Sequence, residues 1–420
     1  MARRRREKSE PRSGADLARR ALLRWLLGSP LLALPGSAPA LGTVPATAPR
    51  TIRSAEDAVD VFDFERLAER ALHPGHWTYL SMGVQEERTL RANRAAFDHY
   101  ALVPRRLVDV RTVDRSVEVL GRPWASPVAL APIGSQGAYH PEAETAVARA
   151  ARKGGHRMIL SHGATKSLSQ VVEARSGPVW SQIYAQRTWA LTRSWIRRAE
   201  SEGCEALVLT VDIVGLPTGR DRIDRLDRTR NPDCAACHGS AKARMLELGE
   251  RALESFGVDA RTMIGRSMML DWSIVDRIRD TTTLPIVLKG ILDPEDADQA
   301  VAHGVDALVV SNHGGRASDH GRASIEALAE IAPVVANRIP ILVDSGFRRG
   351  MDVAKALALG ARAVCIGRPY VWGLAAFGQE GVEGVLKLID REFETALRQL
   401  GRARAIDLDA SAVRRTPPSP

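Results

Sequence analysis

The sequence predicts a single (β/α)₈ barrel of the α/β class, with an N-terminal helical segment and a long lid after the fourth strand. From about residue 127 onward, short apolar runs alternate with amphipathic stretches, as a repeated βα unit requires. Several runs are apolar throughout, which is typical of strands covered on both faces. Eight such runs, nearly all followed by a polar group, favour a closed barrel with its site at the strand exits.

The elements follow in order along the chain. Two helices are predicted at 63–72 and 86–97, ahead of the barrel. The predicted strands are 128–131, 158–160, 179–183, 206–211, 286–288, 307–310, 341–343 and 363–366. The connection 213–283 is much longer than usual and is predicted to be a lid or long loop. The barrel domain is predicted to span residues 41–405, and the proline-rich segment 406–420 is predicted to be a flexible tail.

Residues 1–40 resemble an export signal of the twin-arginine type. Arg19 and Arg20 precede a short apolar run at 25–34, and Ala38-Pro39-Ala40 forms a cleavage site. We therefore expect an exported, periplasmic protein; the alternative is a cytoplasmic protein with a disordered basic tail. The leader has nine basic and three acidic residues, so it carries +6 of the formal charge of +9 and leaves +3 for the rest. This distribution gives little support to a nucleic-acid partner.

Polar or glycine-containing groups follow nearly every predicted strand. In chain order they are Pro132-Ile133-Gly134, Ser161, Gln182 with Tyr184, Thr210 with Asp212, Lys289, Ser311 with His313, Asp344, and Gly367-Arg368. Helix capping explains a single Ser or Asp at such a place, but it does not explain the whole set. We therefore expect an active site at this end of the barrel.

Three runs resemble the FMN-dependent 2-hydroxy acid oxidases and dehydrogenases: S-N-H-G-G-R at 311–316, D-S-G-F-R-R-G at 344–350 and K-A-L-A-L-G-A at 355–361. That family includes glycolate oxidase, lactate oxidase, lactate monooxygenase and mandelate dehydrogenase. The similarity covers about residues 60–405. It implies FMN as cofactor, a lactate-like L-2-hydroxy acid as substrate, and oxygen, a quinone or a cytochrome as electron acceptor. It also implies a homo-tetramer or another homo-oligomer.

The chemistry of such an oxidation explains the catalytic residues that we predict. A base must remove a proton, and the His313 imidazole can accept one near neutral pH. A cation must bind the substrate carboxylate, and the Arg316 guanidinium can do so with two hydrogen bonds. Asp212 would orient the imidazole and stabilise its protonated form.

Further roles come from the resemblance alone. It assigns Tyr79, Arg220 and Arg316 to the substrate carboxylate and Tyr184 to the substrate hydroxyl. It assigns Lys289 to the flavin ring near N1, where a positive charge stabilises the reduced ring. The other predicted FMN-binding residues are Pro132, Ile133, Gly134, Ser161, Gln182, Thr210, Ser311, Asp344, Gly346, Arg348, Gly367 and Arg368, with Asp344 on the ribityl hydroxyls and the two arginines near the phosphate.

The chain departs from the family pattern at four positions. Gly163 stands where small-acid oxidases often have a bulky aromatic residue, and Leu80 replaces a tyrosine. Ile133 replaces a hydroxyl residue, and Gly134 stands where several oxidases have alanine. These changes predict a roomier pocket and leave the size of the substrate open.

The predicted lid contains Cys234-Ala235-Ala236-Cys237-His238, the attachment signature of c-type haem. A haem there could accept electrons one at a time, which gives an alternative function, a haem-c electron-transfer protein on an FMN barrel. However, haem attachment normally follows export of an unfolded chain, and that conflicts with the twin-arginine signal. A disulfide, a metal pair or a lid without a cofactor are further alternatives, and no other metal site is predicted. A third hypothesis, a non-catalytic hydroxy acid binding protein, needs neither His313 nor Lys289.

Overall fold

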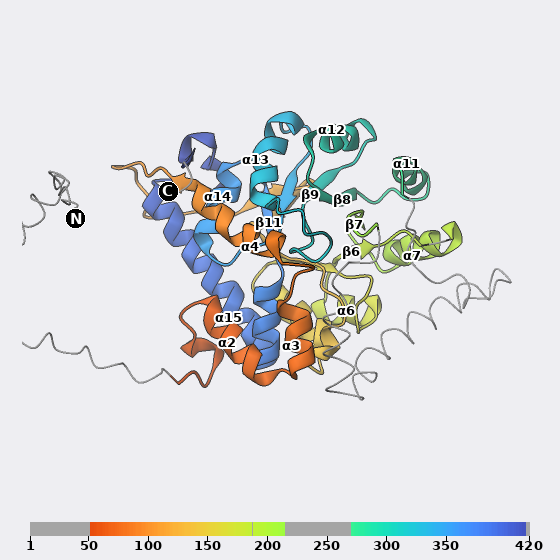
Figure 1. Cartoon of the computed structure of the whole chain (residues 1–420), viewed down its shortest axis with the longest axis horizontal. Helices are drawn as coiled ribbons and strands as arrows, with labels where there is room; N and C mark the ends of the chain where they lie inside the picture. The colour runs from red at the N-terminus through yellow and green to blue at the C-terminus, as the bar shows by residue number, and fades with distance from the viewer. Residues whose placement is uncertain (1–50, 187, 215–269, 417–420) are drawn as a thin grey trace, which may run out of the picture. The chain divides into compact units, whose positions relative to one another are not determined.

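A computed structural model describes residues 51–186, 188–214 and 270–416, and eight of its strands close into a parallel barrel (Figure 1). The barrel strands are β4 Val128–Leu130, β5 Arg157–Leu160, β6 Trp180–Ile183, β7 Ala206–Thr210, β8 Ile286–Ile291, β9 Ala307–Val310, β10 Ile341–Val343 and β11 Ala363–Ile366. They pair in sequence order, and β11 closes the barrel by pairing with β4. The predicted (β/α)₈ barrel is confirmed, and every predicted strand overlaps an observed one.

A helix follows each barrel strand and covers its outer face. These helices are α5 Ala143–Lys153, α6 Leu168–Arg175, α7 Trp189–Ser201, α11 Ser273–Arg279, α12 Pro294–Ala302, α13 Ser324–Val335, α14 Gly350–Ala358 and α15 Arg368–Leu400. All residues of β7, β9 and β11 are buried, which explains why their sequences are apolar without alternation. Burial of each such aliphatic side chain stabilises the fold by about 1.5–3 kcal/mol.

The long connection predicted at 213–283 contains a helix near its C-terminal end. Residues 215–269 lie outside the described residues, but the end of the predicted loop is the helix α11. Val275 and Ile278 of this helix are buried, so α11 is the regular helix of the fourth βα unit. The prediction of a single loop over 213–283 is therefore wrong at its C-terminal end.

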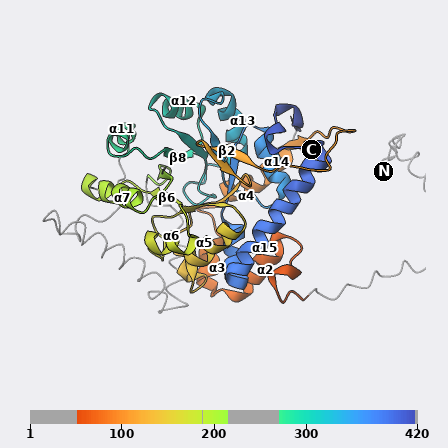
Figure 2. The same cartoon turned by 180° about the vertical axis from the view of Figure 1, so that it is seen from behind.

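The N-terminal segment packs against α15 through its first two elements, at one end of the molecule in both views (Figures 1 and 2). Its elements are η2 Ala55–Asp57, α2 Val61–Ala71, α3 Pro74–Ser81, α4 Arg88–Ala95, η3 Ala96–His99, β1 Tyr100–Leu102, β2 Val117–Val119 and β3 Arg122–Trp124. The two predicted helices correspond to α2 and to α4 with η3. The helix α3 was not predicted, because only two of its eight residues, His76 and Leu80, are buried, and one pair four residues apart is too short a pattern to identify a helix.

The hairpin β2–β3 covers the amino-terminal end of the barrel. Trp124 contacts Trp180 at the start of β6 edge to face, with ring centres 5.4 Å apart. The strand exits lie at the opposite end. A short turn of helix, η4 Gln136–Ala138, follows β4 there.

Residues 405–416 contain regular elements, so the predicted flexible tail is wrong for residues 406–416. It forms η5 Ala405–Asp407, η6 Ala410–Ala412 and β12 Val413–Arg415. The strand β12 pairs antiparallel with β1, and Ala412 is fully buried. A partner strand some three hundred residues earlier in the chain, which local composition cannot reveal, stabilises this segment.

Among the described residues, no helix has the length and apolar character needed to cross a membrane. The predicted export signal at 1–40, Arg220, and the run Cys234–His238 lie outside the described residues.

Candidate active site

The predicted base and its orienting carboxylate lie together at the strand exits. The Nδ1 atom of His313 is 2.9 Å from Oδ1 of Asp212. Their side chains are 23% and 9% exposed, so the imidazole is accessible while the carboxylate is buried. The other ring nitrogen, Nε2, has no hydrogen-bond partner among the described residues. The pair can therefore accept a proton at Nε2 and hold it as an imidazolium.

The charge of Asp212 is maintained by its neighbours. Burial by itself would raise the pKa of the Asp212 carboxyl, but the His313 imidazole and the Lys289 ammonium lower it below its usual value. The carboxylate is thus ionised at neutral pH. Its Oδ2 atom is buried and has no hydrogen-bond partner in the part of the chain that the structure describes.

Lys289 is a buried cation at the exit of β8. Its Nζ donates to Ser311 Oγ at 2.9 Å and lies 3.2 Å from Asp344 Oδ2. Burial alone would lower the pKa of Lys289, but the carboxylates of Asp344 and Asp212 raise it above its usual value. Ser311 Oγ also accepts from the backbone N–H of His313 at 3.0 Å. The cation is therefore connected to the loop that carries the base.

Three side chains from neighbouring strands form a polar row. Gln182 Nε2 donates to Thr210 Oγ1 at 3.0 Å. Gln182 Oε1 accepts from Ser161 Oγ at 3.3 Å and from the backbone N–H of His162 at 3.0 Å. The structure thus brings together the residues predicted for the polar edge of a flavin ring.

The loops after β4 and β5 approach each other closely beside this row. A Cβ on Gly134 would lie 2.9 Å from the carbonyl oxygen of Gly163, so glycine is required there. A Cβ on Gly163 would make only ordinary contacts, at 3.9 Å. Position 163 could therefore hold a Cβ without crowding, whereas position 134 could not. Pro132 and Ile133 lie in the same loop after β4, and both are partly exposed.

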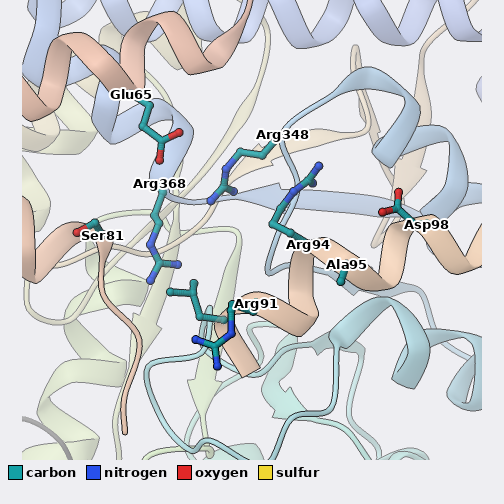
Figure 3. Close-up of a pocket in the computed structure, with 9 residues that line it drawn as sticks. Glu65, Ser81, Arg91, Arg94, Ala95, Asp98, Arg348 and Arg368 are labelled. Carbon is teal, nitrogen blue, oxygen red and sulfur yellow. The ribbon is translucent and has the colours of Figure 1, made fainter. Parts of the chain in front are cut away.

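A cavity of about 540 Å³ lies outside the ends of β10 and β11 (Figure 3). It is lined by Glu65, Ser81, Leu90, Arg91, Arg94, Ala95, Asp98, Arg348 and Arg368. Burial lowers the pKa of Arg348 to about 10, and burial with the nearby Arg316 lowers that of Arg368 to about 9. Both guanidinium groups remain charged at neutral pH, and such a cluster suits an anion such as phosphate.

The backbone next to these arginines also suits an anion. Gly367 is the N-cap of α15, and Arg368 is the first residue of that helix, whose amino terminus attracts negative charge. Gly346 has a φ of +87°, and a Cβ on it would lie 2.2 Å from the backbone oxygen of Asn93. Only glycine can therefore occupy this position in the loop after β10.

Arg316 is held against the C-terminal end of α3. Its Nη1 donates to the carbonyl oxygens of Tyr79, at 2.6 Å, and Met82, at 3.0 Å. The guanidinium also lies over the Tyr79 ring, 4.5 Å from its centre. The structure therefore places Tyr79 and Arg316 side by side, as expected for two groups that bind one carboxylate. Tyr184, predicted for the substrate hydroxyl, follows β6 and is partly exposed.

Arg368 forms hydrogen bonds both to the end of α3 and to the loop after β9, which carries His313 and is called the catalytic loop below. Its Nε donates to the carbonyl oxygen of Leu80 at 2.9 Å, and its Nη1 donates to that of Gly314 at 3.0 Å. Part of its donor capacity is therefore used on the backbone, which the sequence did not indicate.

Helix α4 contributes residues that the sequence did not single out. Asn93 and Asn312 exchange two buried hydrogen bonds, at 2.8 and 2.6 Å. The next residue, Arg94, donates to the carbonyl oxygen of Gly346 and to Asp352. One turn of α4 thus holds both the catalytic loop and the arginine-containing loop after β10. In the sequence these residues look like the polar face of an ordinary helix.

A flavin-type site at the mouth of a (β/α)₈ barrel agrees with the similarity to known proteins. The sequence profile described as FMN-dependent dehydrogenase matches residues 68–415. A peroxisomal (S)-2-hydroxyacid oxidase of Arabidopsis thaliana is 38% identical over 359 residues, which cover 86% of this chain and 97% of the relative. An L-lactate oxidase of Nostoc sp. is 39% identical over 357 residues, covering 84% and 97%.

Solved structures show the same relationship. A mandelate oxidase with bound (S)-2-phenylpropionate superposes with a TM-score of 0.72 at 37% identity, covering 83% of this chain and 96% of that one. An active chimera of (S)-mandelate dehydrogenase, in a mutant form, gives a TM-score of 0.77 at 31% identity, covering 85% and 99%. The chain belongs to the family of FMN-dependent 2-hydroxy acid oxidases and dehydrogenases. It is an enzyme that acts on CH–OH groups with FMN as cofactor, so the hypothesis of a non-catalytic binding protein is not retained.

Proposed function

We propose that this enzyme oxidises an L-2-hydroxy acid of lactate-like type to the corresponding 2-keto acid, and passes the electrons to oxygen or to a respiratory acceptor. The observation that carries the proposal is the His313–Asp212 pair, with a 2.9 Å contact at Nδ1 and an accessible imidazole. Arg316 follows in the same loop, beside Tyr79. One loop thus carries both the base and a cation that could bind the carboxylate of a small acid.

The roles of the protein groups follow from this geometry. Arg316 and Tyr79 would bind the substrate carboxylate, and Tyr184 its hydroxyl. His313 Nε2 would take the proton that the substrate loses, and Asp212 would stabilise the resulting imidazolium. FMN, when bound, supplies the acceptor for the two electrons that leave the substrate carbon.

The described residues fit FMN at both of its ends. The arginine-lined cavity and the amino terminus of α15 suit the phosphate, which Arg348 and Arg368 would hold with the backbone of Gly346 and Gly367. At the other end, the buried ammonium of Lys289 would stabilise negative charge on the ring. The edge of the flavin ring would be surrounded by the polar row of Ser161, Gln182 and Thr210, by Ser311 and by the loop 132–134. Asp344 would bind the ribityl hydroxyls.

The decisive experiment is the visible spectrum of the purified protein, recorded without oxygen before and after addition of L-lactate and then of larger 2-hydroxy acids. We expect the flavin bands to bleach with at least one acid. In the His313→Gln variant we expect FMN to remain bound but not to be reduced. His303→Gln is a matched control, because His303 also has a carboxylate, Asp276, 3.1 Å from its Nδ1, but lies at the C-cap of α12, away from the site.

Retention of full activity by His313→Gln would refute the proposed base. A flavin that stays oxidised with every acid would refute the proposed reaction. The space beside Gly163 supports trials of acids larger than lactate. Admission of oxygen, a quinone or a cytochrome to the reduced enzyme would then identify the electron acceptor from the rate of flavin reoxidation.

We further propose that the leader directs export to the periplasm and that the mature protein assembles as a homo-oligomer. The twin arginines and the A-x-A run support export, and the resemblance to the family supports assembly. The haem alternative rests on Cys234, Cys237 and His238 alone. A haem band in the same spectrum would favour it, and a pure flavin spectrum from exported protein would contradict it.

A further inference from the structure

Strand β8 has a bulge directly after Lys289. The register of β8 against β9 shifts between Lys289 and Ile291, and the residue between them is Gly290. Gly290 has a φ of +114°, which lies in a region that residues with a Cβ rarely adopt. Bulges of this kind often change the direction of a side chain beside an active site.

The bulge is in direct contact with Asp212. A Cβ on Gly290 would lie 2.6 Å from the Cβ of Asp212 and 2.9 Å from both its Cγ and its backbone nitrogen. Carbon atoms in contact normally lie about 3.5–4 Å apart. Just before Asp212, the backbone N–H of Val211 donates to the carbonyl oxygen of Lys289 at 2.9 Å. The end of β7 and the bulge of β8 therefore leave no space for a side chain at residue 290.

This contact lies directly behind the catalytic pair. The Asp212 side chain packs on Gly290 at its base and contacts His313 Nδ1 at its tip, at 2.9 Å. Its second oxygen accepts no hydrogen bond from the described residues, so no such bond to that atom would keep the carboxylate in place. A group added at residue 290 would push Asp212 away from its present position, and the carboxylate would lose its fixed relation to the imidazole.

We propose that Gly290 is a positioning residue: the missing side chain at the β8 bulge allows Asp212 to close on His313 and so sets the orientation of the base. Gly290 acts through Asp212 and does not itself contact the reacting groups. The inference rests on the proposed role of His313, but the position of Asp212 can be measured without turnover.

The test compares Gly290→Ala with Gly360→Ala. Gly360 is a matched control because its φ is +104° and a Cβ on it would lie 2.8 Å from Ala332 Cβ, in the turn between α14 and β11. Both variants introduce a methyl group at a crowded position with positive φ, so both should lose stability. Only Gly290→Ala should lower kcat, by about 10²-fold as expected for a small misplacement of a catalytic group. We expect the KM for the acid and the FMN content to change little.

Two further measurements separate positioning from a general structural effect. In a crystal structure of Gly290→Ala, the distance from Asp212 Oδ1 to His313 Nδ1 should exceed hydrogen-bond range. In an Asp212→Gly background, which removes the crowded side chain, adding Gly290→Ala should change the residual kcat by no more than about twofold, because the two changes act through one contact.

Three results would overturn the inference. They are full activity of Gly290→Ala, an unchanged distance from Asp212 to His313, and a loss of kcat in the Asp212→Gly background as large as the loss in the wild-type background. If Gly290→Ala alone does not fold with flavin, the double variant decides. Recovery of folded, flavin-containing protein on adding Asp212→Gly supports the contact, and failure to recover contradicts it. If the distance lengthens while His313→Gln remains active, the proposed function fails and the positioning role of Gly290 stands.

Discussion

Replacement of Lys289 by methionine would leave a buried carboxylate without its cation. Lys289 and Asp344 are 3% and 6% exposed, so water cannot compensate for the loss. Methionine keeps the length of the side chain but removes the charge that lies 3.2 Å from Asp344 Oδ2. Asp344 would retain the hydrogen bond from Ser345 Oγ, at 2.7 Å. Breaking a buried ion pair by removing one partner costs about 3–5 kcal/mol, and we expect this decrease in the free energy of unfolding.

The assay is denaturant unfolding at neutral pH, followed by circular dichroism on protein from which the flavin has been removed, so that changes in flavin binding do not contribute. The control is the double variant Lys289→Met with Asp344→Asn, in which both charges are absent. It should recover most of the stability that the single variant loses. A loss below about 1 kcal/mol in the single variant, or no recovery in the double variant, would refute the reasoning.

Two other predictions concern parts of the fold away from the site. Burial would raise the pKa of Asp390, but bonding to His156 and the charge of Arg115 lower it below its usual value. The stabilisation by Asp390 is therefore present above about pH 4 and is lost as the pH falls through the depressed pKa of the folded state. In the Asp390→Asn variant, the free energy of unfolding should fall less steeply below about pH 4. An unchanged slope of this free energy against pH would contradict the prediction. Deletion of residues 405–416 should lower the thermal midpoint, because it exposes the core around Ala412 and removes the partner of β1; an unchanged midpoint would show that the segment does not contribute to stability.

The barrel could be predicted because its strands are short, apolar and regularly spaced. The predicted bounds of a strand differ from the observed bounds where the strand contains a functional residue. The predicted fifth barrel strand ended at Leu288, whereas β8 continues to Ile291. Lys289 and Gly290 interrupt the apolar run, and their places in the strand depend on contacts with β7 and β9 that a local pattern does not contain.

The catalytic pair could also be predicted, since His313 and Asp212 each follow a strand and the strand exits of a barrel converge. The supporting residues could not. Asn93 contacts Asn312 across 219 residues of chain, and in the sequence it is one polar residue among several on an amphipathic helix. The same holds for the contact of Gly290 with Asp212, because the need for glycine there comes from packing and not from a turn motif.

The contacts at the end of α3 have a consequence for the order in which the enzyme can become functional during synthesis. Arg316 reaches back 237 residues to Tyr79, and Arg368 reaches back 288 residues to Leu80. Helix α3 can therefore contribute to the mouth of the site only after almost the whole barrel has been synthesised. Contacts so distant in sequence close late and slow the folding of the chain. Assembly of the site is thus an event of the completed polypeptide, and a chain truncated before α15 would have most of its strands and no working site.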